Sequence, residues 1–300
     1  MEGEGSHLPV LLDEVTFLLR PRRGGWVVDG TIGMGGHAER LLEVSDEHTR
    51  LLGLDRDPEA LRRAARRLQR FGGRVTLRQG SFRDIAAHAQ EVGVAEAAAI
   101  LLDLGLSSYQ LEVSGRGFSF QHDEPLDMRF DPGHGRTAAD LLARLSETEL
   151  ARILFEHGEE RHARRIARRI VERRQHTPLV TTTELVDAIK AGVPRPAWSH
   201  RTHVATRTFQ ALRMAVNEEM PALQEALEAA PELLERGGRL GVISFHSGED
   251  RAVKRAFRAL GARGFVSLEP SPMTPSDDET RDNPRARSAK LRVLERMEAA

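Results

Sequence analysis

The chain has 300 residues, of which 40% are hydrophobic and 30% charged, a composition that excludes disorder as a description of the whole chain. Its 44 basic and 45 acidic side chains give a formal net charge of -1, so any nucleic-acid binding must come from local patches. Cysteine is absent, which excludes disulfides and Cys-based metal centres, and we expect no metal. We find no long apolar stretch and no secretion signal, so we expect a cytoplasmic protein with no membrane partner.

Strands and helices alternate in the first hundred residues. Trp26 to Asp29 is typical of a short buried strand, and it runs into a glycine-rich loop and a helical segment over 38–44. A helix begins at Pro58, and further strands are predicted at 51–54, 75–77 and 97–102. This alternation predicts an α/β fold with a doubly wound parallel sheet.

The alternation of strands and helices ends after the fourth strand. Residues 104–206 carry only helix signals and Gly/Pro-rich loops, which predicts an inserted all-helical domain. The alternation of strands and helices then resumes. The elements predicted there are a long helix over 208–236 that Pro221 and Pro231 could kink, a strand over 239–245, a helix over 249–260, a loop over 269–284 and a last strand over 288–294. The expected organisation is therefore a first part of the α/β domain at 1–106, an inserted helical substrate-recognition domain at 107–205, and a second part at 206–300.

The loop after the first strand predicts a nucleotide-like cofactor, because glycines there let the backbone approach a ligand at a helix N-terminus. Asp55 ends the second strand, 22 residues after Gly33, where it can accept hydrogen bonds from ribose hydroxyls. Residues 33–38 also fit G-x-G-x-x-A, the dinucleotide fingerprint, so NAD is an alternative cofactor. Asp29 favours S-adenosylmethionine, since a carboxylate would repel a pyrophosphate but could face an aminoacyl ammonium group.

Several motifs together resemble one known family. They are His7-Leu-Pro-Val-Leu-Leu12, Asp29-Gly-Thr-Ile-Gly-Met-Gly-Gly-His37, Leu54-Asp-Arg-Asp-Pro58, Leu102-Asp-Leu-Gly-Leu-Ser-Ser108, Arg116-Gly-Phe-Ser-Phe120, Leu126-Asp-Met-Arg129, Ala205-Thr-Arg-Thr-Phe-Gln-Ala-Leu-Arg213, Ile243-Ser-Phe-His-Ser247 and Asn283-Pro-Arg-Ala-Arg-Ser288. Matching in order from His7 to about Val293, the chain resembles the RsmH (MraW) methyltransferases. The resemblance implies a class I methyltransferase-like domain that uses S-adenosyl-L-methionine to methylate the exocyclic N4 of a cytidine in the decoding region of bacterial 16S ribosomal RNA.

The resemblance also implies a set of cofactor-binding residues. It assigns Gly35, Gly36 and His37 to the methionine end of the cofactor and Asp55 to the ribose. Phe82, Asp103 and Gln110 complete the set, with Phe82 placed where an aromatic ring can lie against adenine. Two positions depart from the family pattern, Gly248 and Phe130.

Asp103 is the candidate catalytic residue. The amino group of cytosine is a poor nucleophile, so a nearby acceptor must hold its N–H bonds and later receive a proton. Asp103 could do this or could only position the cofactor, and both roles stay open. Tyr109 could supply a stacking surface, and the polar groups of Ser244 and His246 could line the base pocket or only satisfy buried backbone.

Three basic segments predict contacts to phosphates. They lie at 161–174, 195–213 and 281–292, and the first could equally be a salt-bridged solvent face. His200 and His203 are interleaved with the second. The expected partner is small-subunit ribosomal RNA or the assembled small subunit. Two other functions remain alternatives, an NAD-dependent oxidoreductase and a non-catalytic ribosome-binding protein.

Overall fold

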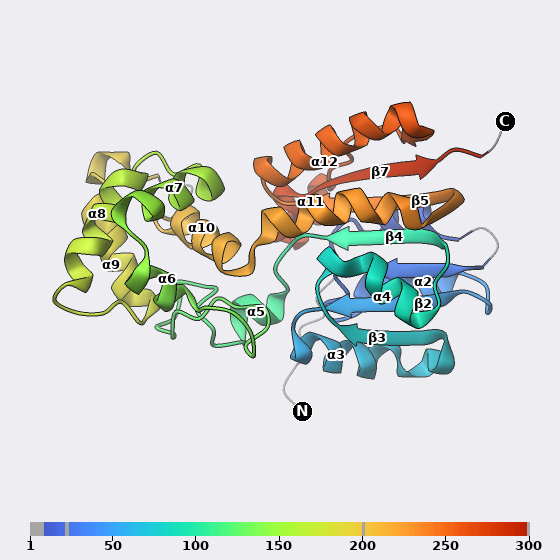
Figure 1. Cartoon of the computed structure of the whole chain (residues 1–300), viewed down its shortest axis with the longest axis horizontal. Helices are drawn as coiled ribbons and strands as arrows, with labels where there is room; N and C mark the ends of the chain where they lie inside the picture. Colours follow the sequence, from blue (N-terminus) through green and yellow to red (C-terminus); the bar gives the residue numbers. More distant parts are fainter. Residues whose placement is uncertain (1–8, 22–23, 200–201, 299–300) are drawn as a thin grey trace. The chain divides into compact units, whose positions relative to one another are not determined.

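The computed structural model describes residues 9–21, 24–199 and 202–298 and divides into two compact units (Figure 1). Unit 1 combines the described residues up to Gly105 with those from Met220 onward, and unit 2 is Leu106–Glu219. Within the described ranges, no helix combines the length and the apolar character that crossing a membrane requires.

Unit 1 is built on a seven-stranded sheet with the order β3-β2-β1-β4-β5-β7-β6. The strands are β1 (Trp26–Asp29), β2 (Arg50–Asp55), β3 (Val75–Gln79), β4 (Ala97–Asp103), β5 (Leu234–Ser244), β6 (Phe265–Ser267) and β7 (Lys290–Arg296). The first five are parallel, and β7 runs antiparallel between β5 and β6. The central strand β4 is apolar and buried over Ala97 to Leu102, as expected for a parallel strand covered on both faces.

Helices cover both faces of this sheet (Figure 1). Apolar side chains of α1 (Leu12–Leu19), α2 (Gly36–Val44) and α3 (Pro58–Leu68) pack in one core cluster. Those of α4 (Ile85–Val92), α11 (Glu219–Ala229) and α12 (Ser247–Leu260) pack in another, which contains the side chains of the opposite sheet face. The predicted α/β fold with a doubly wound sheet is therefore confirmed.

The second half of the sheet differs from the sequence prediction in detail. The three-residue strand β6 was not predicted, because only Phe265 in it is buried and it has no periodic signal. The predicted loop over 269–284 contains a short helix, α13 (Asp277–Asp282). The predicted helix over 208–236 is wrong at both its middle and its end: it breaks at Glu218, which has a left-handed φ of 51°, and its last residues belong to β5.

Unit 2 has its own apolar core, made by helices and loop residues of that unit alone. The helices are α5 (Ser108–Glu112), α6 (Ala138–Arg144), α7 (Glu147–Gly158), α8 (Ala163–Arg174), α9 (Thr182–Gly192) and α10 (Thr206–Asn217). Four of them begin with a capping box, in which a Ser or Thr hydroxyl accepts from a backbone N–H of the first turn and an Asp, Glu or Gln side chain accepts from the backbone N–H of that Ser or Thr. Among the described residues of this unit no strand forms, and the only β contact is a bridge between Pro125 and Thr181. The fold class with an inserted all-helical domain is confirmed.

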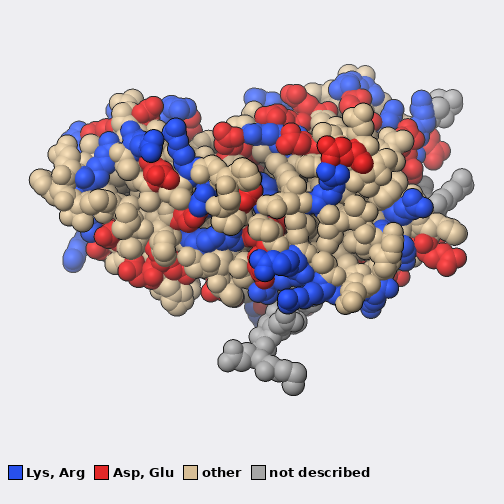
Figure 2. Space-filling view, turned by 60° about the horizontal axis from the view of Figure 1, so that its bottom comes forward, with Lys and Arg blue, Asp and Glu red and all other residues tan. Residues whose placement is uncertain are grey.

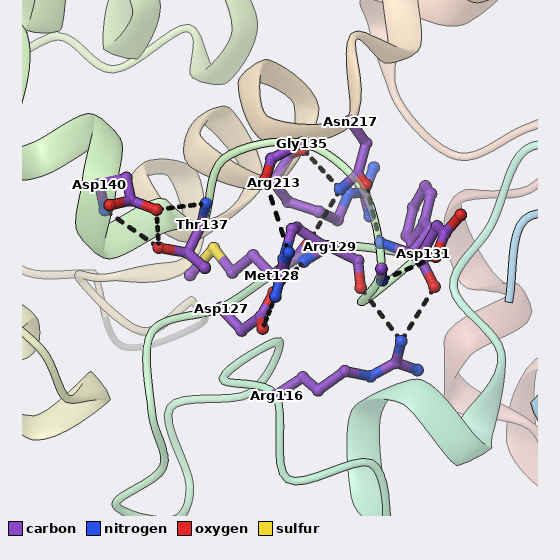
Figure 3. Close-up of polar contacts among 12 residues, drawn as sticks. Arg116, Asp127, Met128, Arg129, Asp131, Gly135, Thr137, Asp140, Arg213 and Asn217 are labelled. Carbon is purple, nitrogen blue, oxygen red and sulfur yellow. Dashed lines mark hydrogen bonds and ion pairs between the residues drawn. The ribbon is translucent and has the colours of Figure 1, made fainter.

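Helix α10 lies in unit 2, whereas the sequence analysis began the second α/β part at residue 206. The reason is visible at its last residue, Asn217, whose side chain holds a tight loop of unit 2 (Figure 3). The Asn217 amide donates to the Met128 carbonyl at 2.7 Å and accepts from the Phe130 N–H at 2.8 Å. Met128 is buried with a left-handed φ of 61°, and Arg116 donates to the carbonyls of residues 129 and 130. The loop and α10 are therefore one structural unit.

Gly158, the last residue of α7, allows α7 and α10 to approach closely. A Cβ at position 158 would lie 2.5 Å from the Arg207 carbonyl oxygen and 3.1 Å from the Ala211 Cβ. A backbone carbonyl inside a helix cannot move alone, so the two helices would have to separate.

We expect Gly158→Ala to destabilise unit 2 by about 1–3 kcal/mol, the usual cost of overpacking. The chain has two tryptophans, Trp26 in unit 1 and Trp198 in unit 2, so urea unfolding in a Trp26→Phe background follows Trp198 alone. Gly133→Ala is the control, because Gly133 is exposed and its Cβ would meet only the end of the Asp131 side chain. Equal unfolding midpoints for the two variants would show that the α7–α10 contact is not tight.

Candidate functional site

Three carboxylates meet at the carboxyl edge of the sheet. Asp29, Asp55 and Asp103 are the last residues of β1, β2 and β4, which are neighbours in the sheet. Because the strands are parallel, their carboxyl ends lie at one edge, where ligands bind in open α/β sheets.

The loop between β1 and α2 is tied to both neighbouring strands. Its backbone donates from Gly30 to the Leu101 carbonyl at 2.9 Å, from Ile32 to the Leu54 carbonyl at 2.8 Å, and from Gly33 to Asp55 Oδ2 at 2.9 Å. Gly35 caps α2 with a φ of 81°, a left-handed conformation that favours glycine. The N-terminus of α2 is thereby fixed beside the three carboxylates.

Asp29 is the most buried of the three, with 1% of its surface exposed. Burial, together with the nearby carboxylates of Asp103 and Asp55, raises the pKa of Asp29 to about 7, although hydrogen bonds from Thr31 lower it. The Thr31 N–H donates to Asp29 Oδ1 at 3.0 Å. Asp29 is thus a carboxylate that a positive group would stabilise strongly.

Asp55 is held by backbone N–H groups on both oxygens. Oδ1 accepts from Asp57 and Oδ2 from Gly33, both at 2.9 Å. Burial raises the pKa of Asp55 to about 6, although these two hydrogen bonds lower it. A carboxylate oxygen accepts more than one hydrogen bond, so Asp55 keeps capacity for ligand hydroxyls.

Asp103 is linked to the glycine loop through Thr31 and His37. The Asp103 N–H donates to the Thr31 hydroxyl at 2.6 Å, and His37 Nδ1 lies 3.8 Å from Asp103 Oδ2. His37 is buried on α2, and its Nε2 contacts the Val10 carbonyl at 2.9 Å. Thr31 was not predicted from the sequence; the signal that could have found it is its place two residues after a strand-ending acid, where hydroxyls often satisfy backbone.

The structure brings most of the predicted cofactor residues together. Gly36 begins α2, and a Cβ there would lie 2.4 Å from Pro9 Cγ. Phe82 follows β3, and its Cβ lies 3.0 Å from the position that a Gly30 Cβ would take. Gly35, Gly36, His37, Asp55, Phe82 and Asp103 all belong to unit 1.

Gln110 belongs to unit 2, unlike the other predicted cofactor residues. It lies in α5, where its side chain accepts from the Ser107 N–H at 3.1 Å and its own N–H donates to the Ser107 hydroxyl at 3.2 Å. Tyr109 lies on the same short helix. The role of Gln110 that these contacts define is the capping of α5.

Ser244 is the last residue of β5 and His246 lies two residues later, and their polar groups contact neighbouring backbone and one acid. His246 caps α12, with Nδ1 accepting from the Glu249 N–H at 3.3 Å and Nε2 3.1 Å from Glu249 Oε1. The Ser244 hydroxyl is 3.5 Å from the Lys290 carbonyl. Within the described ranges, no group of three or more His, Asp or Glu side chains is arranged to hold a metal ion.

The basic helix of unit 2 is partly neutralised. On α8, Arg168, Arg169 and Arg173 form ion pairs with acids, whereas Arg164 and Arg165 are exposed and have no ion pair with another described residue. In the second basic segment, His200 and Arg201 lie outside the described residues.

Comparison with known proteins gives consistent matches over nearly the whole chain. The model of the MraW methylase family matches residues 4–297. Two proteins named ribosomal RNA small subunit methyltransferase H, from Geotalea uraniireducens and Geobacter sp. strain M21, are 48% and 49% identical, each match covering 97% of this chain and 98% of the relative. A solved structure titled putative rRNA-methylase from Clostridium thermocellum aligns over 95% of both chains with a TM-score of 0.46 and 14% identity.

The raised carboxylate pKa values predict that unit 1 loses stability as the pH rises. An acid whose pKa in the folded state lies above its ordinary value of 3.8 contributes most to the free energy of unfolding at low pH, where it is protonated. This contribution is lost as the pH rises through the folded-state pKa, which is about 6 for Asp55 and about 7 for Asp29. We expect Asp29→Asn to flatten the fall in unfolding free energy between pH 5 and 8 by at most about 3 kcal/mol, because about two pH units separate pH 5 from the Asp29 pKa of about 7 and each is worth about 1.4 kcal/mol.

Urea unfolding followed through Trp26 in a Trp198→Phe background measures this effect. The control is Asp84→Asn, which removes an exposed acid of the same unit that makes no side-chain cap bond. An Asp29→Asn protein that keeps the pH dependence of the parent would contradict the burial of an ionisable Asp29.

Proposed function

The chain belongs to the MraW methylase family, and from this premise we propose that it transfers a methyl group from S-adenosyl-L-methionine to small-subunit ribosomal RNA. The finer proposal is that the acceptor is the exocyclic N4 of a cytidine in the decoding region of the 16S RNA. The reaction would then take place in the cytoplasm, on the RNA or on the assembled small subunit.

The observation that carries the proposal is the gathering of Asp29, Asp55 and Asp103 around the glycine loop. S-adenosylmethionine has two positive groups, a sulfonium and an ammonium, which such a cluster attracts. A pyrophosphate carries two negative charges, which the same carboxylates would repel. The residues present therefore fit S-adenosylmethionine and disfavour the alternative, an NAD-dependent oxidoreductase.

Each residue of the cluster has a distinct part in this proposal. Asp29 would face the ammonium group, and Gly35, Gly36 and His37 would lie along the methionine end. The free acceptor capacity of Asp55 suits ribose hydroxyls, and the Phe82 ring suits the adenine. Gln110 is proposed to complete the set from unit 2.

The cofactor supplies an activated methyl group, and Asp103 would handle the proton of the target. It ends β4 beside the loop, and it is placed there through the hydrogen bond from its own N–H to Thr31. We assign it to accept an N–H of the target amino group, because that group loses a proton when it gains the methyl.

RNA binding is supported by local charge on a nearly neutral chain. Basic and acidic side chains are both spread over the face drawn in Figure 2, so charge of neither sign covers that face as a whole. The exposed Arg164 and Arg165 of α8 are suited to phosphate contacts of the kind that RNA offers.

Calorimetry with S-adenosylmethionine and with NAD tests the cofactor. We expect S-adenosylmethionine alone to bind, with an affinity that rises between pH 5.5 and 8 and with release of protons, since a positive ligand favours the ionised Asp29 and Asp55. Proton release is read from titrations in two buffers of different ionisation enthalpy. Binding of NAD in preference would overturn the proposal.

The Asp103→Asn variant separates the two roles of Asp103, because it keeps the shape and removes the charge. If Asp103 accepts the amino proton, we expect single-turnover methylation of unmethylated small subunits to fall by about 10²-fold or more at saturating cofactor. If it only positions the cofactor, the loss would lie in the dissociation constant and would disappear at saturation. A full rate at saturation would remove Asp103 from the proton transfer.

A further inference from the structure

The buried imidazole of His37 has its proton placement fixed on one side. Its Nε2 contacts the Val10 carbonyl oxygen at 2.9 Å, and a carbonyl can only accept a hydrogen bond. Nε2 must therefore carry a hydrogen. Any change in the charge of this ring takes place at the other nitrogen, Nδ1.

Nδ1 faces a carboxylate. It lies 3.8 Å from Asp103 Oδ2, too far for a hydrogen bond but within the range of an ion pair. A bare lone pair on Nδ1 would face negative charge, whereas a proton on Nδ1 would be attracted by it. Asp29 and Asp55 add further negative charge to the same edge of the sheet.

A positive charge near Asp103 favours its ionised form, which is the form that can accept a proton. Carboxylates grouped together resist ionisation, and Asp29 shows the effect, since the charges of Asp103 and Asp55 contribute to its raised pKa. A carboxylic acid that is already protonated cannot take the proton of an amino group.

We propose that His37 carries a proton on Nδ1 and is the charge partner that keeps Asp103 ionised for the target amino group. His37 is then a positioning residue that acts through Asp103. The inference rests on the proposed function. In that reaction the new N–C bond forms as the S–C bond of S-adenosylmethionine breaks, and the sulfur keeps the electron pair of the broken bond. The proton that the amino group loses passes to the Asp103 carboxylate.

The segment that supplies the Val10 carbonyl is itself held in place. Leu11 has a left-handed φ of 54°, and its N–H donates to Glu279 Oε1 at 2.7 Å. Pro9 packs against Gly36, one residue before His37. The ring is thus clamped between this segment and Asp103, and it cannot exchange its two nitrogens without breaking the Val10 contact.

The test is His37→Gln, because a Gln amide can still donate to the Val10 carbonyl but provides no charge at the Nδ1 position. Single-turnover methylation of unmethylated small subunits is measured from pH 6 to 9, with each variant saturated with S-adenosylmethionine. We expect a loss of about tenfold or more at pH 7 that recovers as the pH rises and Asp103 ionises without help. An equal loss at every pH, or none at saturation, would overturn the proposal.

The double variant His37→Gln/Asp103→Asn shows whether His37 acts through Asp103. We expect His37→Gln to change the rate by less than about twofold once Asp103 has lost its charge. If the rate loss of the double variant equals the product of the two single-variant losses, His37 acts independently of Asp103 and the proposal is overturned.

Nitrogen-15 NMR of the histidine rings, recorded on the protein without substrate, measures the protonation state of His37 beside Asp103 directly. The His37 signals, identified by their loss in His37→Gln or by site-specific labelling if that variant does not fold, should report both ring nitrogens protonated at pH 7. Asp103→Asn should lower that protonated fraction. A neutral His37 at pH 7 would overturn the proposal. Failure of the wild-type protein to methylate small subunits would instead overturn the proposed function, without changing the NMR result on His37.

Discussion

The structure of unit 1 depends on three carboxylates that lie at one edge of its sheet. Removing a carboxylate from water is costly unless hydrogen bonds or positive charges replace the water. Here hydrogen bonds from backbone N–H groups of the loop after β1 and from the Thr31 hydroxyl replace part of that water. The shape of the loop follows from that requirement, because its donors must point at Asp29 and Asp55 while α2 begins beside them. Part of the repulsion is left uncompensated, and this remainder is what a positively charged ligand would neutralise.

The structure of unit 2 depends on its own core and on one loop contact. Its core contains no side chain of the sheet, and its long loop is closed by Asn217 at the end of α10. The Asn217 amide and the Arg116 backbone and side chain both hold the loop around the left-handed Met128, so the loop geometry depends in part on α10. Residue-level changes in the core of unit 2 should therefore act first on the stability of that unit.

Much of this organisation follows from sequence patterns, and the failures have physical causes. Buried strands that end in Asp29, Asp55 and Asp103, with a glycine loop at the right spacing, predicted the sheet and its edge because parallel strands place those ends together. The helix break at Glu218 was missed, since a glutamate carries no left-handed signal and Pro221 drew the prediction. Strand β6 was missed because three residues beside β7 form it through pairing and not through their own pattern. The Thr31 and Val10 contacts were missed because they join segments by backbone groups, which no side-chain motif reveals.

The His37 environment shows how distant segments complete a local motif. Residues 33–37 form one continuous loop and helix start, yet the hydrogen on His37 Nε2 is set by a carbonyl 27 residues earlier. That carbonyl is oriented by the left-handed Leu11, whose N–H is bound by an acid from α13, 268 residues further along the chain. A change at Glu279 would thus reach the ring through Leu11 and Val10 without touching the glycine loop. The position of the His37 ring beside Asp103 is therefore determined jointly by the first described residues, the glycine loop and the segment before β7.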